Sequence, residues 1–270
     1  MVRRWVFSSR WLPISQRWFT AARFRHLAGR AVAAVFPDDC RLCSQPLYEF
    51  SRIPVCANCL KPPEPFEPQY FCSSCRTPFV SRFPLDDQGL CTLCRLGHTR
   101  FDAAHTYGAY DGALRRLIHL FKYDGVEPLA APLGDWMLSV LPGRDFDAVV
   151  PMPMHWRRRW TRGFNHAARL ARHVARRTGI PLRNLVRRRR GTAPQAGLTS
   201  AGRRANVAGA FRASGEVRGL RILLIDDVLT TGATAGACAA ALKRAGAASV
   251  SILTAARADR RLFSPAAVSS

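Results

Sequence analysis

At 270 residues the chain has room for one small module and one domain of about 170 residues. Its hydrophobic content of 48% supplies a core, and no apolar stretch reaches the length of a transmembrane helix. The net charge of +23 comes from arginine, because only Lys61, Lys122 and Lys243 are lysine. Such a charge favours nucleic acid, phosphorylated small molecules or an acidic membrane as partners, although a GC-rich genome that encodes arginine for every surface cation would give the same value.

Residues 1–36 form a basic, aromatic leader that contains Trp5, Trp11 and Trp18. Residues 21–36 carry apolar positions at helical spacing, which predicts an amphipathic helix. Two interpretations stay open, namely packing on the module that follows and contact with a membrane surface or DNA. The leader lacks the apolar core and the cleavage site of a secretory signal, so we expect a cytoplasmic protein.

Cysteines dominate the next segment, where eight of the nine form four Cys-x-x-Cys pairs. The pairs are Cys40/Cys43, Cys56/Cys59, Cys72/Cys75 and Cys91/Cys94. Two such pairs place four thiolates around one tetrahedral Zn²⁺, so we expect two structural zinc sites with no open coordination position. Sequential pairing is the simplest arrangement, and an interleaved pairing stays open. A disulfide framework fits poorly, because Cys238 has no partner and no cleavable signal precedes the pairs.

The zinc segment is rich in proline and has only short apolar runs. Modules of about thirty residues cannot bury enough apolar surface to fold without a metal or another cross-link. We therefore expect that replacing Cys40 or Cys72 loosens this small module and leaves the larger domain folded.

The second part of the chain alternates strands and helices. The predicted elements are a strand over 103–110, helices around 114–121 and 129–140, a strand over 146–150, a helix over 164–177, a strand over 222–225, a helix over 235–245 and a strand over 250–253. This alternation predicts an α/β fold with a doubly wound parallel sheet, whose ligands bind at the carboxyl ends of the strands. The strand ends at 151–153 and 226–227 should then border one cleft.

An acidic pair and a loop of small and hydroxyl residues follow the strand at 222–225. Asp226 and Asp227 stand where this strand should end, and the loop reads Thr230, Thr231, Gly232, Ala233, Thr234 before an alanine-rich helix. Backbone N–H groups of such a loop and the positive helix end can hold a phosphate, while carboxylates can accept hydrogen bonds from sugar hydroxyls or face Mg²⁺. Because the two carboxylates carry like charges, replacing either with Asn should be neutral or slightly stabilising for the ligand-free protein.

This stretch resembles the phosphoribosyl pyrophosphate signature of type I phosphoribosyltransferases. The resemblance implies that Asp226 and Asp227 contact the ribose hydroxyls and that Thr230, Thr231, Gly232, Ala233 and Thr234 hold the 5-phosphate. It also implies that the ligand binds together with Mg²⁺.

Three further segments extend the resemblance to the ComF family, whose members combine zinc ribbons with a phosphoribosyltransferase-like domain. They are 114–123, 150–165 and the positions Thr192, Gln195, Leu198, Arg203, Asn206 and Phe211. With the cysteine pairs and the acidic pair, the match runs from Pro37 to Arg257. His166 stands where the family usually has Gln. The resemblance implies a double zinc ribbon over 37–98, a phosphoribosyltransferase-like domain over 99–260, a tail over 261–270, and a link to DNA uptake.

Cationic side chains beside the expected cleft are candidates for the pyrophosphate. Arg157, Arg159 and Arg162 follow the strand end at 151–153, and arginine forks suit phosphate oxygens. A solvated basic loop is the alternative reading. Lys122 ends a predicted helix, where it either complements the negative helix end or enters the cleft.

Two functions remain open from the sequence. The leading hypothesis is an enzyme that binds Mg²⁺–phosphoribosyl pyrophosphate and transfers the phosphoribosyl group to an acceptor with release of pyrophosphate. The alternative is a non-catalytic protein that binds single-stranded DNA, or DNA-uptake proteins, through the zinc ribbons and the arginines. The residues do not identify the acceptor, the general base or the oligomeric state.

Overall fold

The computed structural model describes residues 38–49, 51–65, 68–79, 82, 85–97, 99–154, 164–189 and 209–258. The chain divides into two compact units, Met1–Leu60 and Lys61–Ser270. The predicted domain bounds at residues 36, 98 and 260 stay predictions. The division itself places the first four of the paired cysteines in one unit and the last four in the other.

Each set of four cysteines begins in a small antiparallel hairpin. In the first unit β1 (Asp38–Asp39) pairs with β2 (Pro46–Leu47), and in the second unit β3 (Tyr70–Phe71) pairs with β4 (Pro78–Phe79). A short helix, α2 (Thr92–Arg95), follows in the second unit.

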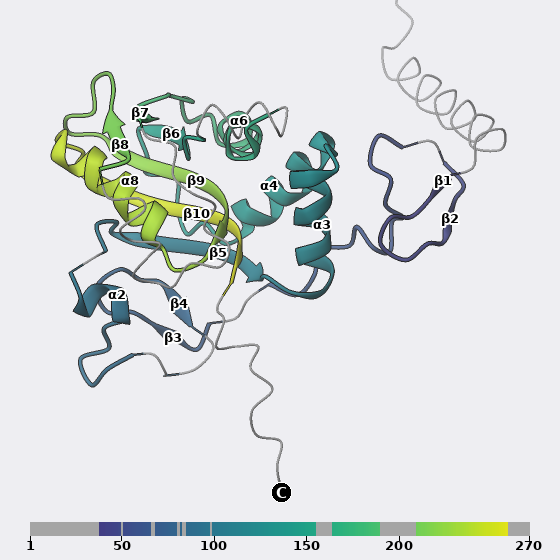
Figure 1. Ribbon diagram of the computed structural model, residues 1–270, viewed down its shortest axis with the longest axis horizontal. Helices are drawn as coiled ribbons and strands as arrows, with labels where there is room; N and C mark the ends of the chain where they lie inside the picture. The colour runs from purple at the N-terminus through teal and green to yellow at the C-terminus, as the bar shows by residue number, and fades with distance from the viewer. Residues whose placement is uncertain are drawn as a thin grey trace, which may run out of the picture. The chain divides into compact units, whose positions relative to one another are not determined.

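The second unit is built on a four-stranded parallel sheet in the order β5–β10–β9–β6 (Figure 1). These strands are β5 (Ala103–Ala109), β6 (Ala148–Pro151), β9 (Arg221–Leu229) and β10 (Ser249–Arg257). β9 and β10 are central, as strands covered on both faces must be: β9 is apolar and buried from Ile222 to Ile225, and β10 is buried from Val250 to Arg257. A separate two-stranded antiparallel sheet pairs β7 (Val186–Arg188) with β8 (Phe211–Ala213).

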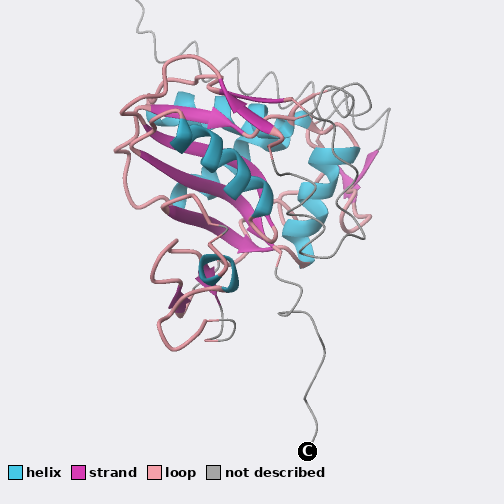
Figure 2. Cartoon of the chain, turned by 60° about the vertical axis from the view of Figure 1, so that its left-hand side comes forward, coloured by secondary structure: helices cyan, strands magenta, loops and turns pink. Residues whose placement is uncertain are grey.

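Helices lie on both sides of the sheet (Figure 2). They are α3 (Gly112–Tyr123), the 3-10 turn η1 (Glu127–Leu129), α4 (Ala130–Ser139), α6 (His166–Thr178) and α8 (Ala233–Arg244). α4 and α6 pack on each other and on the strands, while α8 packs with β7, β8 and β10. This arrangement confirms the predicted doubly wound α/β fold.

The strand that carries the acidic pair is longer than the sequence predicted. β9 continues through Asp226 and Asp227 to Leu229, because β10 keeps pairing with it as far as Arg257. Pairing with β6 on the other side stops at Ile225. The two carboxylates therefore lie inside β9 but beyond the end of its neighbour β6.

No helix in the described part of the chain is long and apolar enough to cross a lipid bilayer.

Candidate functional site

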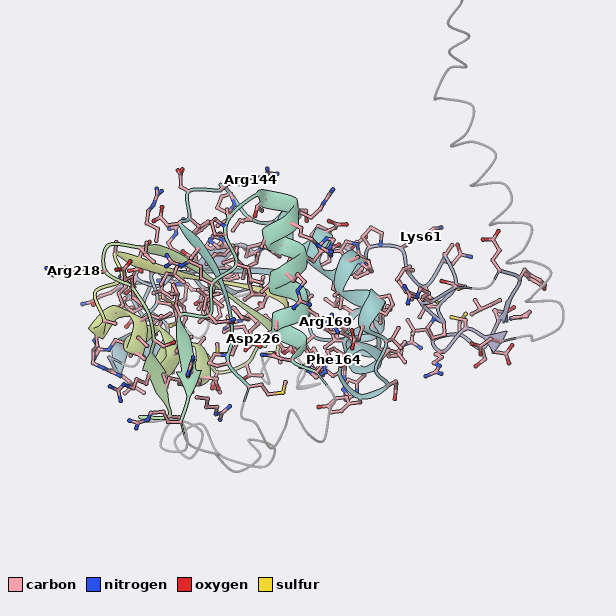
Figure 3. All side chains as sticks on the ribbon, turned by 90° about the horizontal axis from the view of Figure 1, so that it is seen from above. Lys61, Arg144, Phe164, Arg169, Arg218 and Asp226 are labelled. Carbon is pink, nitrogen blue, oxygen red and sulfur yellow. The ribbon has the colours of Figure 1, made fainter. Side chains whose placement is uncertain are left out.

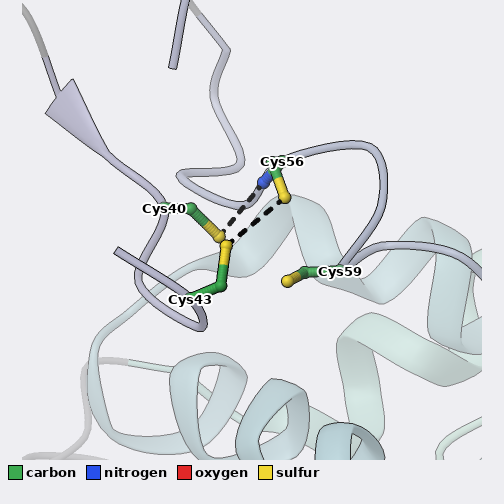
Figure 4. Close-up of side chains that lie close together, drawn as sticks. All are labelled: Cys40, Cys43, Cys56 and Cys59. Atoms are coloured by element: carbon green, nitrogen blue, oxygen red, sulfur yellow. Dashed lines mark hydrogen bonds between the residues drawn. The ribbon is translucent and has the colours of Figure 1, made fainter. Parts of the chain in front are cut away.

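Eight cysteines form two clusters, each built from pairs that are consecutive in the sequence. The first cluster consists of Cys40, Cys43, Cys56 and Cys59 (Figure 4), and the second of Cys72, Cys75, Cys91 and Cys94. Within each cluster the four Sγ atoms lie within 4.8 Å of one another. The sequential pairing is thus the arrangement found, and the interleaved alternative is excluded.

The spacing of the sulfur atoms fits a tetrahedral metal ion. The Sγ–Sγ distance is 3.7 Å for Cys43–Cys56, and in the second cluster it is 3.6 Å for Cys72–Cys94 and 3.8 Å for Cys75–Cys91. Zn–S bonds of about 2.3 Å in a tetrahedron give an edge of about 3.8 Å. A disulfide would need about 2.0 Å, so the cysteines are arranged as ligands and not as bridges.

The two clusters repeat one hydrogen-bond pattern. The backbone N–H of Cys56 donates to Cys40 Sγ at 3.3 Å, and the N–H of Cys91 donates to Cys72 Sγ at the same distance. The residue after each first pair, Ser44 or Arg76, has a positive φ of 58° or 51°. In each cluster a backbone N–H group of the second cysteine pair therefore orients the first sulfur atom of the first pair.

The thiols within each cluster differ in pKa. Burial raises the pKa of Cys40, but hydrogen bonds from the backbone of Cys56, Leu42 and Cys43 bring it down to about 6. The hydrogen bond with Cys75 lowers the pKa of Cys91 to about 5 against the effect of burial. Each cluster therefore offers a thiolate at neutral pH, which is the form that binds a metal.

A second set of functional candidates gathers at the carboxyl edge of the sheet. Because the four strands are parallel, the end of β6, the acidic pair of β9 and the loop before α8 reach the same edge. Met152, just after β6, donates its N–H to the carbonyl oxygen of Ile225 at 2.8 Å. This bond fastens the segment after β6 beside the acidic pair, as the topology led us to expect.

Lys122 of α3 points to the acidic pair. Its Nζ lies 2.7 Å from Oδ1 of Asp227, and the two side chains are only 13% and 14% exposed. Burial alone would lower the pKa of Lys122, but the carboxylate of Asp227 and, more weakly, that of Asp226 raise it above its ordinary value. The structure thus shows Lys122 in an ion pair with Asp227, and a role toward a ligand in the expected cleft stays a prediction.

Asp226 has a different environment, because successive residues of a strand point to opposite faces. Burial and the negative charge of Asp226 raise the pKa of Cys238 of α8. The positive charge of Arg188 of β7 acts to lower the pKa of Asp226. Burial and the neighbouring charge of Asp227 raise the pKa of Asp226 to about 7. Its Oδ1 accepts the N–H of Asp227 at 3.0 Å. Figure 3 labels Asp226 within the second unit.

The loop of residues 230–234 turns from β9 into α8 at Gly232. This residue is the N-cap of α8 and has a φ of +75°, a conformation that favours glycine. The hydroxyl of Thr231 accepts the N–H of Ala233 at 3.4 Å, and Gly236 donates to the carbonyl of Gly232 at 2.7 Å. The positive end of a 12-residue helix thus opens at this edge of the sheet.

A buried aromatic group supports the end of α3, and sequence reasoning missed it. Nε2 of His166 is 2.9 Å from the backbone oxygen of Lys122, and the His166 ring contacts those of Phe121 and Phe164 at centroid distances of 5.4 and 4.6 Å. Arg169 lies over Phe164, and both are labelled in Figure 3. The sequence marked His166 only as a departure from the family pattern, which gave no sign that it holds Lys122 in place.

Three of the predicted site residues cannot be placed. Arg157, Arg159 and Arg162 lie outside the described residues, so their assignment to the pyrophosphate stays a prediction.

Comparison with known proteins gives consistent matches. Residues 161–267 match the model of the phosphoribosyl transferase domain. The chain is 30% identical over 225 residues to the DNA utilization protein YhgH of Salmonella typhimurium, covering 80% of this chain and 95% of that protein. It is 28% identical over 230 residues to competence protein F of Haemophilus influenzae, covering 80% and 90%. Among solved structures, glutamine phosphoribosylpyrophosphate amidotransferase from B. subtilis matches with 23% identity and a TM-score of 0.35, over 47% of this chain and 26% of that one.

Proposed function

This chain belongs to the family of competence protein F and the DNA utilization protein YhgH, and from that premise we propose that it binds phosphoribosyl pyrophosphate with Mg²⁺. In this proposal it transfers the phosphoribosyl group to an acceptor and releases pyrophosphate. The names of the relatives support a role in the uptake or use of DNA, and the phosphoribosyl transferase domain supports the chemistry.

One observation carries the proposal, namely that Asp226, Asp227 and the 230–234 loop share the carboxyl edge of the sheet. The N-terminal end of α8 and the loop suit a 5-phosphate, since N–H groups and the helix dipole favour an anion there. The carboxylates suit the 2- and 3-hydroxyls of ribose as hydrogen-bond acceptors. Carboxylate oxygens are also the ligands that Mg²⁺ prefers, so the residues present fit the metal.

The residues would act by positioning and by charge. During transfer the bond from the sugar C1 to pyrophosphate breaks, a bond from C1 to the acceptor forms, and positive charge develops on the sugar. The carboxylates of Asp226 and Asp227 stabilise that charge, and Lys122 positions the carboxylate of Asp227 through their 2.7 Å contact. Mg²⁺, when bound, would offset the negative charge of the pyrophosphate. Arg157, Arg159 and Arg162 are proposed to hold the same leaving group.

We also assign one structural Zn²⁺ to each cysteine cluster, because four sulfur ligands leave no open position. Thiolate ligands persist in reducing compartments, which supports the cytoplasm as the location.

Calorimetric titration with Mg²⁺ and phosphoribosyl pyrophosphate tests the main proposal. We expect binding by the unmodified protein and at least tenfold weaker binding by Asp226→Asn at pH 8, where Asp226 is ionised. Asp87→Asn is the matched control, because it makes the same charge change at an exposed position of the second cysteine module. Absence of binding by the unmodified protein, or equal binding by both variants, would overturn the proposal.

A second candidate function is the binding of single-stranded DNA, which one surface feature favours. Tyr70 and Phe71 of β3 are 38% and 43% exposed, and the guanidinium of Arg76 lies 5.4 Å from the centre of the Phe71 ring. Exposed rings beside cations can stack on bases.

Two variants separate the candidates. Phe71→Ala should weaken binding of a thymidine oligonucleotide and leave phosphoribosyl pyrophosphate binding unchanged. The triple alanine variant of Arg157, Arg159 and Arg162 should lose pyrophosphate affinity even at high salt if these residues hold the leaving group. If they bind DNA instead, pyrophosphate affinity should stay unchanged, and the salt dependence of DNA binding should fall by about one unit for each DNA phosphate that the variant no longer neutralises.

A further inference from the structure

We propose that the second cysteine cluster controls the geometry of the 230–234 loop, through Leu93, which stands between two of its ligands. Metal binding by Cys72, Cys75, Cys91 and Cys94 would then be a condition for an ordered loop and for tight binding of the ligand. The identity of that ligand rests on the proposed function, whereas the mechanical coupling rests on contacts in the structure.

The first step is a direct contact between α2 and the start of α8. A Cβ atom placed on Gly232 would lie 3.1 Å from Cδ1 of Leu93 and 3.7 Å from Cε1 of Phe101. The N-cap of α8 is therefore packed against Leu93 and Phe101, and a side chain at Gly232 would crowd Leu93. Any movement of Leu93 changes what supports the loop.

The second step is the continuity of the apolar core. Cys72, Cys75 and Cys91 are at most 5% exposed and belong to the same buried cluster as Ala235 and Cys238 of α8. Leu93 and Ala233 are partly buried against this cluster. The metal ligands thus share one core with the helix that begins at the loop.

The third step is the weakness of α2 without its metal. The helix has four residues, Thr92–Arg95, and a helix of that length does not hold itself in water. Cys91 is its N-cap and Cys94 lies within it, so two of four metal bonds would fix its position. Removing the metal releases α2, and with it the Leu93 side chain that supports Gly232.

The first cluster provides an internal control. Cys40, Cys43, Cys56 and Cys59 lie in the other compact unit, Met1–Leu60. Loss of a metal ion from the first cluster breaks the same kind of metal–thiolate bonds but does not loosen α2.

Hydrogen–deuterium exchange of the full-length, metal-loaded protein tests the coupling without any ligand. Leu93→Ala should speed exchange of the amides of residues 231–236 about tenfold, which corresponds to about 1.4 kcal/mol of local opening. Leu96→Ala is the matched control, because Leu96 follows the same helix but is 51% exposed. Leu93→Met, which keeps the volume, should restore slow exchange.

Ligand removal from each cluster completes the test. Cys94→Ser should speed exchange of the same amides, whereas Cys43→Ser should leave them unchanged. If Cys94→Ser disrupts the whole second unit, Leu93→Ala still decides, since it touches no ligand. Unchanged exchange in Leu93→Ala, or an equal effect of Leu96→Ala, would overturn the inference.

Titration with Mg²⁺ and phosphoribosyl pyrophosphate then links the coupling to binding. We expect Leu93→Ala to weaken the affinity about tenfold and Leu96→Ala to leave it unchanged. If the unmodified protein does not bind this ligand, the proposed function fails, while the exchange data still decide the coupling. Faster loop exchange with unchanged affinity in Leu93→Ala would refute the claim that the cluster governs ligand binding.

Discussion

The ammonium nitrogen of Lys122 lies 2.7 Å from Oδ1 of Asp227, and both side chains are nearly buried. The adjacent carboxylates of β9 are therefore not equivalent. Asp227 forms an ion pair with a lysine, while burial and the charge of Asp227 raise the pKa of Asp226 to about 7. The two positions should respond in opposite ways to the same substitution.

Asp227→Asn should destabilise the ligand-free protein, because it leaves the ammonium of Lys122 buried without its carboxylate. Removing one member of a buried ion pair costs about 3 kcal/mol, and urea unfolding would measure the loss. The sequence alone led us to expect a neutral or slightly stabilising change, since it showed the like charges but not the lysine. The double variant Lys122→Met, Asp227→Asn is the control and should recover most of the stability. Full stability of Asp227→Asn would show that the pair contributes nothing.

Asp226→Asn should instead stabilise the ligand-free protein, and only at the higher pH values. The pKa of Asp226 is raised from 3.8 to about 7 in the folded state. The protonated side chain of Asp226 therefore contributes its full stabilisation of the fold below pH 4, and this stabilisation is lost as the pH rises through 7. The Asn side chain keeps the acceptor for the N–H of Asp227 and carries no charge. Urea unfolding should show a gain over the unmodified protein at pH 8 and no gain at pH 4, and an equal gain at both would contradict the assigned pKa.

The same titration should govern binding of Mg²⁺ and phosphoribosyl pyrophosphate. A carboxylate that faces hydroxyl donors and a cation must be ionised, so affinity should rise from pH 5 to about 7 and then level off. Calorimetry in buffers of different ionisation enthalpy should detect a proton released on binding near pH 6. Asp226→Asn retains any titration of the ligand itself and serves as the control. A pH profile that is identical in the variant would exclude Asp226 as the responsible group.

Most elements of the sheet domain could be predicted from the sequence, because their apolar periodicity is local. The strand at 103–110 and the helix at 164–177 match β5 and α6 within two residues. The end of β9 could not be predicted, because polar Asp226 and Asp227 remain in the strand only through pairing with β10. The pairing of Lys122 with Asp227 joins residues far apart in the chain, so no local pattern reveals it.

Gly134 shows the same limit of local reasoning, and it gives a further prediction. Replacing a glycine within a helix by alanine usually stabilises by about 1 kcal/mol. In α4, however, a Cβ on Gly134 would lie 2.6 Å from Cδ2 of His173, which is 8% exposed and bonded to Asp135 at 2.9 Å. Gly134→Ala should therefore lower stability by about 1–3 kcal/mol through overpacking between α4 and α6. Gly143→Ala, where nothing lies within 4 Å, is the control and should change little in thermal unfolding.

The last prediction separates the two metal sites, which the sequence treated as one module. Elemental analysis of protein purified without chelator should find two zinc ions per chain, and Cys40→Ser and Cys72→Ser should each reduce the number to one.

Cys40→Ser should leave the melting temperature of the second unit unchanged, because Cys40 belongs to the first unit. Cys72→Ser should lower that melting temperature by about 5 °C or more, since Cys72 is fully buried in the core shared with α8. The sequence suggested that both substitutions would spare the larger domain, but it could not show that the second cluster packs into the core of that domain. Equal melting of the two variants would mean that the second cluster stabilises its own loops and not the sheet domain.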